Sequence, residues 1–189
     1  MKILCFGDSN TYGYDPCTCL GSRYPAEHRW VEILAQKQNW QVINLGENGR
    51  EIPKREAEWL RFERMLDQQK PIDLLMIMLG TNDLLQGNAP EKVAQRMESF
   101  LRYIDLEKSK ILLIGPPSMQ IGEWVPTEIL IDASKKLNQE YKVISERVGV
   151  GFVGTETWNI LLTFDGVHFS EDGHKRFAEK LICYLNEGE

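Results

Sequence analysis

The 189-residue sequence has no long apolar run and no block of like charges. Its longest apolar run, Leu74–Leu79, is far shorter than the roughly 20 residues needed to cross a membrane. The formal net charge is −6, and a chain without a basic stripe is poorly suited to nucleic acid or to an anionic membrane surface. We therefore expect no nucleic-acid partner and no membrane anchor. The N-terminal apolar run is too short for a signal peptide, which favours a cytoplasmic location.

Cysteine and histidine are also scarce, with four and three residues respectively. Cys17 and Cys19 are one residue apart, but no second pair of Cys or His residues follows at the spacing of a zinc site. We interpret this pair as part of a loop, with a metal site as the less favoured alternative.

Short apolar segments alternate with longer amphipathic segments along the chain. The predicted strands are Lys2–Phe6, Gln41–Leu45, Ile72–Leu79, Lys110–Ile114 and Gly151–Val153. The predicted helices are Glu27–Gln38, Pro53–Gln69, Pro90–Tyr103, Pro126–Arg147 and Glu171–Asn186. Most strands are almost continuously apolar, as in a parallel sheet covered on both faces. We expect one α/β domain over residues 1–189, with a ligand site beyond the carboxyl ends of its strands.

Three polar blocks stand next to these elements. Residues 7–10 (Gly-Asp-Ser-Asn) and 80–83 (Gly-Thr-Asn-Asp) each follow a predicted strand, and residues 165–168 (Asp-Gly-Val-His) precede the last predicted helix. Taken singly, each block is an ordinary turn sequence. Taken together, they supply a hydroxyl, an amide, a carboxylate and an imidazole, which are the groups that a serine nucleophile needs.

Ser9 can act as a nucleophile only if a base takes its proton. His28 is expected at the surface or as a cap, and His174 falls inside the last predicted helix. His168 lies in an irregular segment from which it can reach the edge of the sheet, so it is the preferred base. Asp165, three residues earlier, can hold the imidazole by its Nδ1 atom and stabilise the charged ring. An Asp-Gly turn with an incidental histidine stays open as the alternative.

Amide donors could stabilise the oxyanion that forms when a serine attacks a carbonyl. The side chain of Asn82 can donate without forming an ion pair with the base, and one such donor is typically worth ~10²–10³ in turnover. A backbone N–H could come from Gly49 or from Gly46, and their spacing does not separate them. The sequence has no Gly-x-Ser-x-Gly elbow, which disfavours the usual α/β-hydrolase arrangement.

In their order and their spread along the chain, these blocks resemble the SGNH, or GDSL-like, hydrolase family of esterases and acylhydrolases. The resemblance implies a three-layer α/β/α sandwich with a five-stranded parallel, flavodoxin-like sheet. It also implies the cleavage of carboxylic esters without a metal or another cofactor. The implied triad is Ser9, His168 and Asp165, and the implied oxyanion hole is made by Ser9, Gly49 and Asn82.

Residues 13–16, 23–25 and 48–50 are similar to the subgroup of arylesterases and acetyl-xylan esterases. Asn10 departs from the family pattern, which commonly has Leu or another apolar residue there, and Glu51 stands where this subgroup often has Thr. We expect a small-molecule substrate, with a short-chain or acetyl ester favoured.

The substrate pocket is less well defined by the sequence. The residues expected to shape it are Asp8, Asn10, Tyr12, Trp124 and Val167, with Tyr14 and Trp158 as further aromatic candidates. Trp124 could equally pack against a second subunit, so a homo-oligomer stays open. Alternative activities of the same site are carbohydrate O-deacetylation, lysophospholipid or thioester hydrolysis, and acyl transfer. A flavodoxin-like binding module is the non-enzymatic alternative, although the chain lacks the glycine spacing and lysine of a P-loop.

Overall fold

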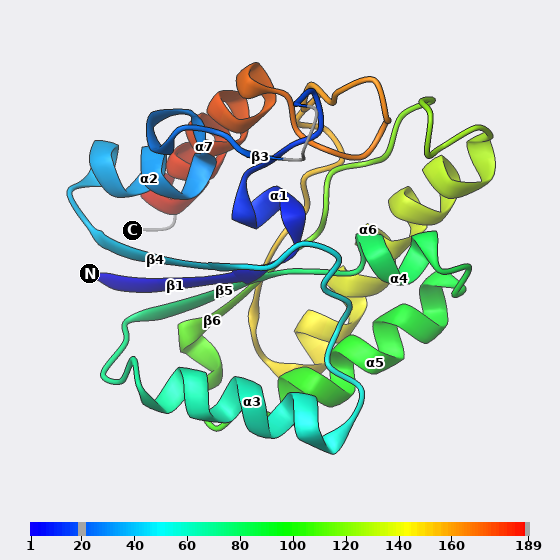
Figure 1. Cartoon of the computed structure of the whole chain (residues 1–189). Helices are drawn as coiled ribbons and strands as arrows, with labels where there is room; N and C mark the ends of the chain where they lie inside the picture. The colour runs from blue at the N-terminus through cyan, green and yellow to red at the C-terminus, as the bar shows by residue number, and fades with distance from the viewer. Residues whose placement is uncertain (19–21, 188–189) are drawn as a thin grey trace.

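The structure is a computed structural model that describes residues 1–18 and 22–187. A five-stranded parallel sheet forms its centre (Figure 1). The strands are β1 (Lys2–Gly7), β4 (Gln41–Gly46), β5 (Leu74–Met78), β6 (Ile111–Ile114) and β7 (Gly151–Val153). Their spatial order is β4-β1-β5-β6-β7. After β1, the chain adds β4 on one side of β1 and then β5, β6 and β7 on the other side. Doubly wound sheets bind ligands at such a switch point.

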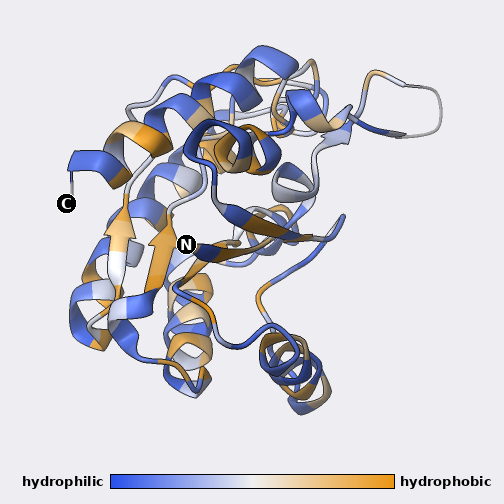
Figure 2. Ribbon diagram, turned by 90° about the vertical axis from the view of Figure 1, so that its left-hand side faces the viewer, coloured by the Kyte–Doolittle hydropathy of each residue, from blue (hydrophilic) through white to orange (hydrophobic). Residues whose placement is uncertain are grey.

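Alternate residues of the strands enter two separate cores, one on each face of the sheet. In β1, Leu4 and Phe6 belong to the core on one face, whereas Ile3 and Cys5 belong to the core on the other. Because both faces are buried, the strands are apolar along most of their length, as Figure 2 shows. The predicted α/β class with a parallel sheet is confirmed.

The helices form a layer on each face of the sheet (Figure 1). The first layer has α2 (Trp30–Gln38) and α7 (Glu171–Glu187), and the second has α3 (Glu56–Asp67), α5 (Pro90–Tyr103) and α6 (Glu128–Val148). Two short helices, α1 (Ser9–Tyr12) and α4 (Thr81–Leu85), follow β1 and β5 directly. The remaining elements are the antiparallel ribbon of β2 (Tyr14–Asp15) and β3 (Ser22–Arg23), with 3-10 turns η1 (Ala26–His28) and η2 (Lys108–Lys110).

Three predicted helices start differently in the structure, among them α6, which begins at Glu128 instead of Pro126. Helix α3 begins at Glu56 instead of Pro53, because the Glu58 carboxylate accepts the backbone N–H groups of Lys54 and Arg55 just before the helix. Pro53 stays outside the helix, and its carbonyl accepts the indole N–H of Trp59 at 2.7 Å. The predicted helix Glu27–Gln38 is divided into η1 and α2 by the extended backbone of Arg29. Because α3 begins only at Glu56, the segment before it stays outside the helix and borders the site described below.

None of the helices in the described part of the chain has the length and apolar character of a membrane span. Within residues 1–18 and 22–187, no three His, Cys, Asp or Glu side chains gather as metal ligands would. Cys17 is exposed, and Cys19, the other half of the Cys-x-Cys pair, lies outside the described residues.

Candidate active site

Three of the expected residues lie at one edge of the sheet, each just after one of the strands β1, β4 and β5. Ser9 follows β1, Gly49 follows β4 and Asn82 follows β5. His168 reaches the same edge from the loop that precedes α7, and its Nε2 lies 3.0 Å from Ser9 Oγ. The fold therefore brings together residues that are up to 159 positions apart in the chain.

A chain of hydrogen bonds links Ser9, His168 and Asp165. His168 Nδ1 lies 2.7 Å from Asp165 Oδ2, on the side of the ring away from Ser9. All three residues are buried. An ionised Asp165 accepts a hydrogen bond from Nδ1–H, so that the proton stays on Nδ1 and Nε2 has a lone pair directed at the Ser9 hydroxyl. The imidazole is thus placed to take the proton of Ser9.

The environment of Asp165 keeps its carboxylate ionised. Burial alone would raise the pKa of Asp165, but hydrogen bonds from the His168 ring and from the backbone N–H groups of His168 and Val167 lower it to about 2. Thr163 Oγ1 donates a further hydrogen bond to Oδ1 at 2.9 Å. The tight turn depends on Gly166, whose φ is +80° and where a Cβ would stand 2.1 Å from the carbonyl oxygen of Gln120.

Gly49 and Gly46, which spacing could not separate, have different surroundings. The N–H of Gly46 donates to Asn44 Oδ1 at 3.0 Å, and a Cβ at Gly46 would stand 2.1 Å from the backbone nitrogen of Tyr12. Gly49 has a φ of +71°, with open space where a Cβ would be. Within the described residues, neither Gly49 nor Ser9 has an acceptor for its N–H. Gly49 is therefore the glycine whose N–H is available to a ligand.

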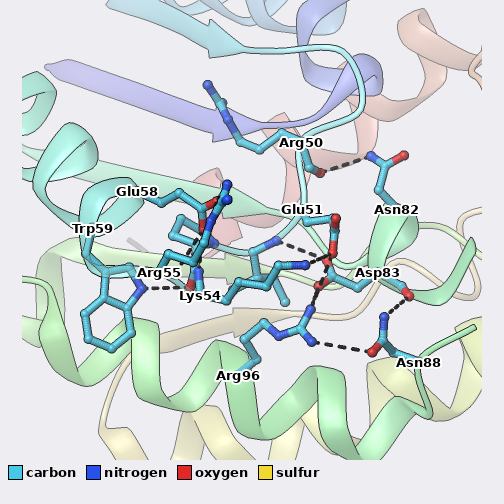
Figure 3. A network of polar contacts seen from close by, with 12 residues as sticks. Arg50, Glu51, Lys54, Arg55, Glu58, Trp59, Asn82, Asp83, Asn88 and Arg96 are labelled. Atoms are coloured by element: carbon cyan, nitrogen blue, oxygen red, sulfur yellow. Dashed lines mark hydrogen bonds and ion pairs between the residues drawn. The ribbon is translucent and has the colours of Figure 1, made fainter. Parts of the chain in front are cut away.

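Asn82 is oriented by the backbone of the segment that follows β4 (Figure 3). Its Nδ2 donates to the carbonyl oxygen of Arg50 at 3.0 Å. This contact fixes which end of the amide carries the nitrogen, and an amide nitrogen has two N–H donors. One donor holds the segment and the second is left for a ligand.

The side chain of Arg50 fastens this segment to the sheet. Its guanidinium donates to the carbonyl oxygens of Gly7, at 2.7 Å, and of Leu45. It also forms an ion pair with Glu47 at 2.7 Å and stacks on the ring of Phe6, 4.2 Å from the centroid. Arg50 thereby connects the ends of β1 and β4 to the loop that carries Gly49.

A buried ion pair of Asp83 and Arg96 supports the same segment from below (Figure 3). Asp83 Oδ2 accepts the N–H of Ile52 at 3.0 Å, and Oδ1 accepts from the Arg96 guanidinium. Burial raises the pKa of Asp83, although the Ile52 N–H and Arg96 oppose the shift. The carbonyl of Asp83 accepts Asn88 Nδ2 at 2.9 Å. Arg96 was not predicted from the sequence, because an arginine within an amphipathic helix usually faces solvent.

The aromatic residues around His168 are not all those expected. The rings of Tyr14 and Trp124 lie 4.8 and 5.1 Å from the imidazole, centroid to centroid, and Trp124 is 48% exposed. The Tyr12 ring packs instead under the guanidinium of Arg23. Trp158 packs in the core against Phe177, 5.3 Å away. Trp124 and Tyr14 are thus the aromatic side chains that flank the base.

The other residues expected in the pocket have roles in holding the backbone. Asp8 is buried and accepts the N–H of Asn10 as the cap of α1, and burial raises its pKa to about 6. The side-chain amide of Asn10 is bonded to the backbone of Val167 and Phe169. Val167 is buried as well. The contacts of Asp8 and Asn10 thus hold the backbone around Ser9 and His168. A role of Asp8, Asn10 and Val167 in the pocket stays a prediction.

The other two histidines lie away from Ser9. His28 Nδ1 is 2.6 Å from the carboxylate of Glu171. His174 is fully buried in α7, where its ring packs against Tyr24 and Phe169. Burial lowers the pKa of His174 to about 3, so that the ring stays neutral. Of the three histidines, only His168 lies within hydrogen-bond distance of Ser9 Oγ, where a base would have to be.

A cleft of about 490 Å³ is lined in part by the segment that carries Gly49. It is bordered by this segment and helix α3. Its apolar side chains are Phe6, Ile52, Phe62 and Met65, and its rim carries Glu47, Glu51, Lys54, Arg55, Glu58 and Arg61. These rim charges are paired with one another, as in Lys54–Glu51 and Arg55–Glu58 (Figure 3). The cleft includes Gly49 and Arg50 but does not include Ser9, Asn82 or His168.

The chain is similar to known proteins in both sequence profile and fold. Residues 5–176 match the sequence profile of the GDSL-like lipase/acylhydrolase family. A search of curated protein sequences finds no significant match. Among solved structures, the chain is similar to a putative arylesterase from Agrobacterium tumefaciens str. C58, with 27% identity, a TM-score of 0.84 and 99% of both chains covered.

Two further solved structures share the fold at lower identity. The aryl esterase of M. smegmatis has 24% identity and a TM-score of 0.82, with 98% of both chains covered. Est24, a carbohydrate acetylesterase from Sinorhizobium meliloti, has 24% identity and a TM-score of 0.80, with 100% of this chain and 99% of that chain covered. Because the family profile extends over residues 5–176, this chain belongs to the GDSL-like lipase/acylhydrolase family of SGNH hydrolases and is a hydrolase of ester bonds.

Proposed function

We propose that this protein is a serine esterase that cleaves short-chain or acetyl esters through an acyl-enzyme on Ser9. The observation that carries the proposal is the chain of hydrogen bonds from Ser9 Oγ through His168 to Asp165, with distances of 3.0 and 2.7 Å. A serine hydroxyl is a weak nucleophile until a base takes its proton, and this chain supplies both the base and the group that orients it.

In the first half of the reaction, Ser9 Oγ attacks the ester carbonyl carbon while His168 Nε2 takes the hydroxyl proton. The carbonyl oxygen becomes an oxyanion that accepts the N–H groups of Ser9 and Gly49 and the second N–H of Asn82. The imidazolium, stabilised by Asp165, then gives its proton to the leaving alcohol. The carbon–oxygen bond to the alcohol breaks, and the acyl group stays on Ser9.

In the second half, His168 takes a proton from a water molecule that attacks the acyl-enzyme. The same donors stabilise the second oxyanion, and the proton returns to Ser9 Oγ as the carboxylic acid leaves. An alcohol in place of water would give acyl transfer by the same steps. Est24, the carbohydrate acetylesterase that shares this fold, supports an acetyl group as the acyl part.

Hydrolysis of p-nitrophenyl acetate by wild type, Ser9→Ala and Ser145→Ala tests the proposal. Ser145 is a buried serine whose hydroxyl bonds the carbonyl of Lys142 within α6, far from the site. We expect Ser9→Ala to lower kcat by at least about 10⁴-fold, because nucleophilic attack is lost. Ser145→Ala should keep kcat within about twofold. Equal activity of wild type and Ser9→Ala would refute the assignment of Ser9.

The alternatives are separated by two further measurements. Stoichiometric labelling of Ser9 by a serine-directed phosphonate supports an enzyme, whereas a binding module would not be labelled. A panel of p-nitrophenyl esters of increasing acyl length, together with acetylated sugars, a lysophospholipid and an acyl thioester, then ranks the substrate classes. A higher kcat/KM on octanoate than on acetate would contradict the small acyl group.

A further inference from the structure

The side-chain amide of Asn10 is bonded to the backbone on both sides of His168. Nδ2 donates to the carbonyl oxygen of Val167 at 3.1 Å, and Oδ1 accepts the N–H of Phe169 at 2.9 Å. Asn10 is the residue after Ser9 and is 6% exposed. One amide therefore links the helix that carries Ser9 to the two neighbours of His168.

Asn10 is itself held rigidly. Its own N–H donates to Asp8 Oδ1 at 3.0 Å, and its carbonyl accepts the indole N–H of Trp30 at 3.0 Å. Trp30 is buried at the start of α2. Because both backbone groups of Asn10 are bonded, its amide cannot follow a movement of the His168 loop without breaking these contacts.

Few other polar contacts connect the two segments. Residues 8–12 and 163–169 are all described, and between them the one further hydrogen bond is the Ser9–His168 contact. The Tyr14 ring adds packing against the imidazole. Other bonds of the His168 loop, such as those from the N–H groups of Gln120 and Trp124 to the carbonyls of Gly166 and Asp165, do not involve residues 8–12. Without the Asn10 amide, the reactive contact would be the one direct hydrogen bond left between the two segments.

We propose that Asn10 is a positioning residue that keeps His168 Nε2 within hydrogen-bond distance of Ser9 Oγ, a role that rests on the proposed function of these two residues. In this chain the side chain at position 10 donates to one backbone atom and accepts from another at the same time. An amide does both, an ionised carboxylate only accepts, and a leucine does neither. A displacement of about 1 Å between reacting groups can slow catalysis on the order of 10²-fold.

The test compares Asn10→Leu with a matched control, Asn138→Leu. Asn138 is also buried, and its amide also joins two backbone groups, donating to Pro116 at 2.8 Å and accepting from Thr155 at 3.5 Å. It has no contact with Ser9 or His168. We expect Asn10→Leu to lower kcat on p-nitrophenyl acetate about 10- to 100-fold with KM within about threefold. Asn138→Leu should lose thermal stability but keep kcat per folded molecule within about twofold.

Asn10→Asp supplies a second readout and serves if Asn10→Leu does not fold. The carboxylate keeps the acceptor for Phe169 but loses the donor for Val167, so kcat should fall about three- to tenfold. Its negative charge next to the His168 segment favours the imidazolium. The acid limb of the kcat/KM profile should therefore move to higher pH, whereas the Asn138→Leu profile should superimpose on that of wild type.

The outcomes separate this inference from the proposed function. If Ser9→Ala were as active as wild type, Ser9 would not be the nucleophile. If Ser9→Ala is inactive but Asn10→Leu keeps kcat within twofold, Asn10 has no positioning role. Equal losses of kcat in Asn10→Leu and Asn138→Leu would also overturn the inference, because they would reflect stability alone. Where only Asn10→Asp folds, an unchanged kcat and an unshifted profile overturn it.

Discussion

The two sides of the site are held in place by different kinds of interaction. On the base side, the segments 8–14 and 163–169 are joined to each other by the neutral hydrogen bonds of Asn10 to the backbone and by the Ser9–His168 contact. The oxyanion side, residues 47–52 and 82–83, is fastened by charged groups. Arg50 bonds two strand-end carbonyls, and Asp83 pairs with Arg96 beneath Ile52.

This difference determines how each side fails when a contact is removed. Loss of a neutral amide displaces the base and leaves two backbone groups without a partner. Loss of one partner of an ion pair leaves a buried charge, which costs more stability than the pair itself contributes. Mutations on the base side should therefore show mainly in turnover, and mutations beneath the oxyanion side should show in stability as well.

The largest effect in this comparison is expected from Asn82→Ala, which removes the side-chain donor to the oxyanion. We predict a fall in kcat of ~10²–10³ with little change in KM, because the lost interaction strengthens in the transition state. Asn88→Ala, in the same polar network but without a donor facing the site, should stay within about threefold. Steady-state kinetics on p-nitrophenyl acetate measures both, and an Asn82→Ala enzyme as active as wild type would remove Asn82 from the oxyanion hole.

A smaller effect, on stability, is expected from Arg96→Met. The Asp83 side chain is fully buried, so this change should lower the free energy of unfolding by about 3 kcal/mol. Turnover should fall about tenfold, because Asp83 would no longer hold the Ile52 N–H as firmly. Urea unfolding monitors the stability.

The double variant Asp83→Asn, Arg96→Met distinguishes a buried charge from lost packing. An asparagine keeps an acceptor for Ile52 without the charge, so most of the lost stability should return. A double variant no more stable than Arg96→Met would show that the charge of Asp83 was not the cause.

The smallest effect is a dependence of stability on pH through His174, which lies in α7 and packs against Phe169 of the base side. Burial holds the pKa of His174 at about 3 in the folded protein, below the ordinary 6.5. Between these values the unfolded chain binds the proton and the folded protein does not, so stability falls as the pH falls. Between pH 6.5 and 5 this amounts to about 2 kcal/mol.

Unfolding of His174→Leu over the same pH range isolates this contribution. The raised pKa of Asp8, about 6, has the opposite sign, because the folded protein then binds more protons than the unfolded chain below pH 6. Asp8 is present in both proteins, so it cancels in the difference. Parallel stability curves for wild type and His174→Leu would contradict the prediction.

Much of the fold was predictable because both faces of the sheet are covered. Strands of this kind are continuous apolar runs, and the five predicted runs correspond to β1, β4, β5, β6 and β7. The short helices α1 and α4 were not predicted, since one turn has no periodicity. The start of α3 was misplaced because Pro53 is suited to a first helical turn, whereas the Glu58 carboxylate, which accepts the N–H groups of Lys54 and Arg55, decides the boundary.

The geometry of the site was predictable where a residue type has few alternatives. With three histidines in the chain, the choice of His168 could be made from its irregular segment, and the structure brings it to Ser9. The supporting residues could not be found in this way. Asn10 and Arg96 act through partners 157 and 13 positions away, and no local pattern encodes such contacts.

The separation of Ser9 and His168 along the chain has a consequence for biosynthesis. Strand β1 is made first, but Ser9, which follows it, meets a base only after residues 163–169 have been made and α7 has docked. Contacts of such high sequence separation form late and slowly. A nascent or truncated chain that ends before residue 163 would carry the nucleophile without reactivity, so the appearance of esterase activity would report the completion of folding.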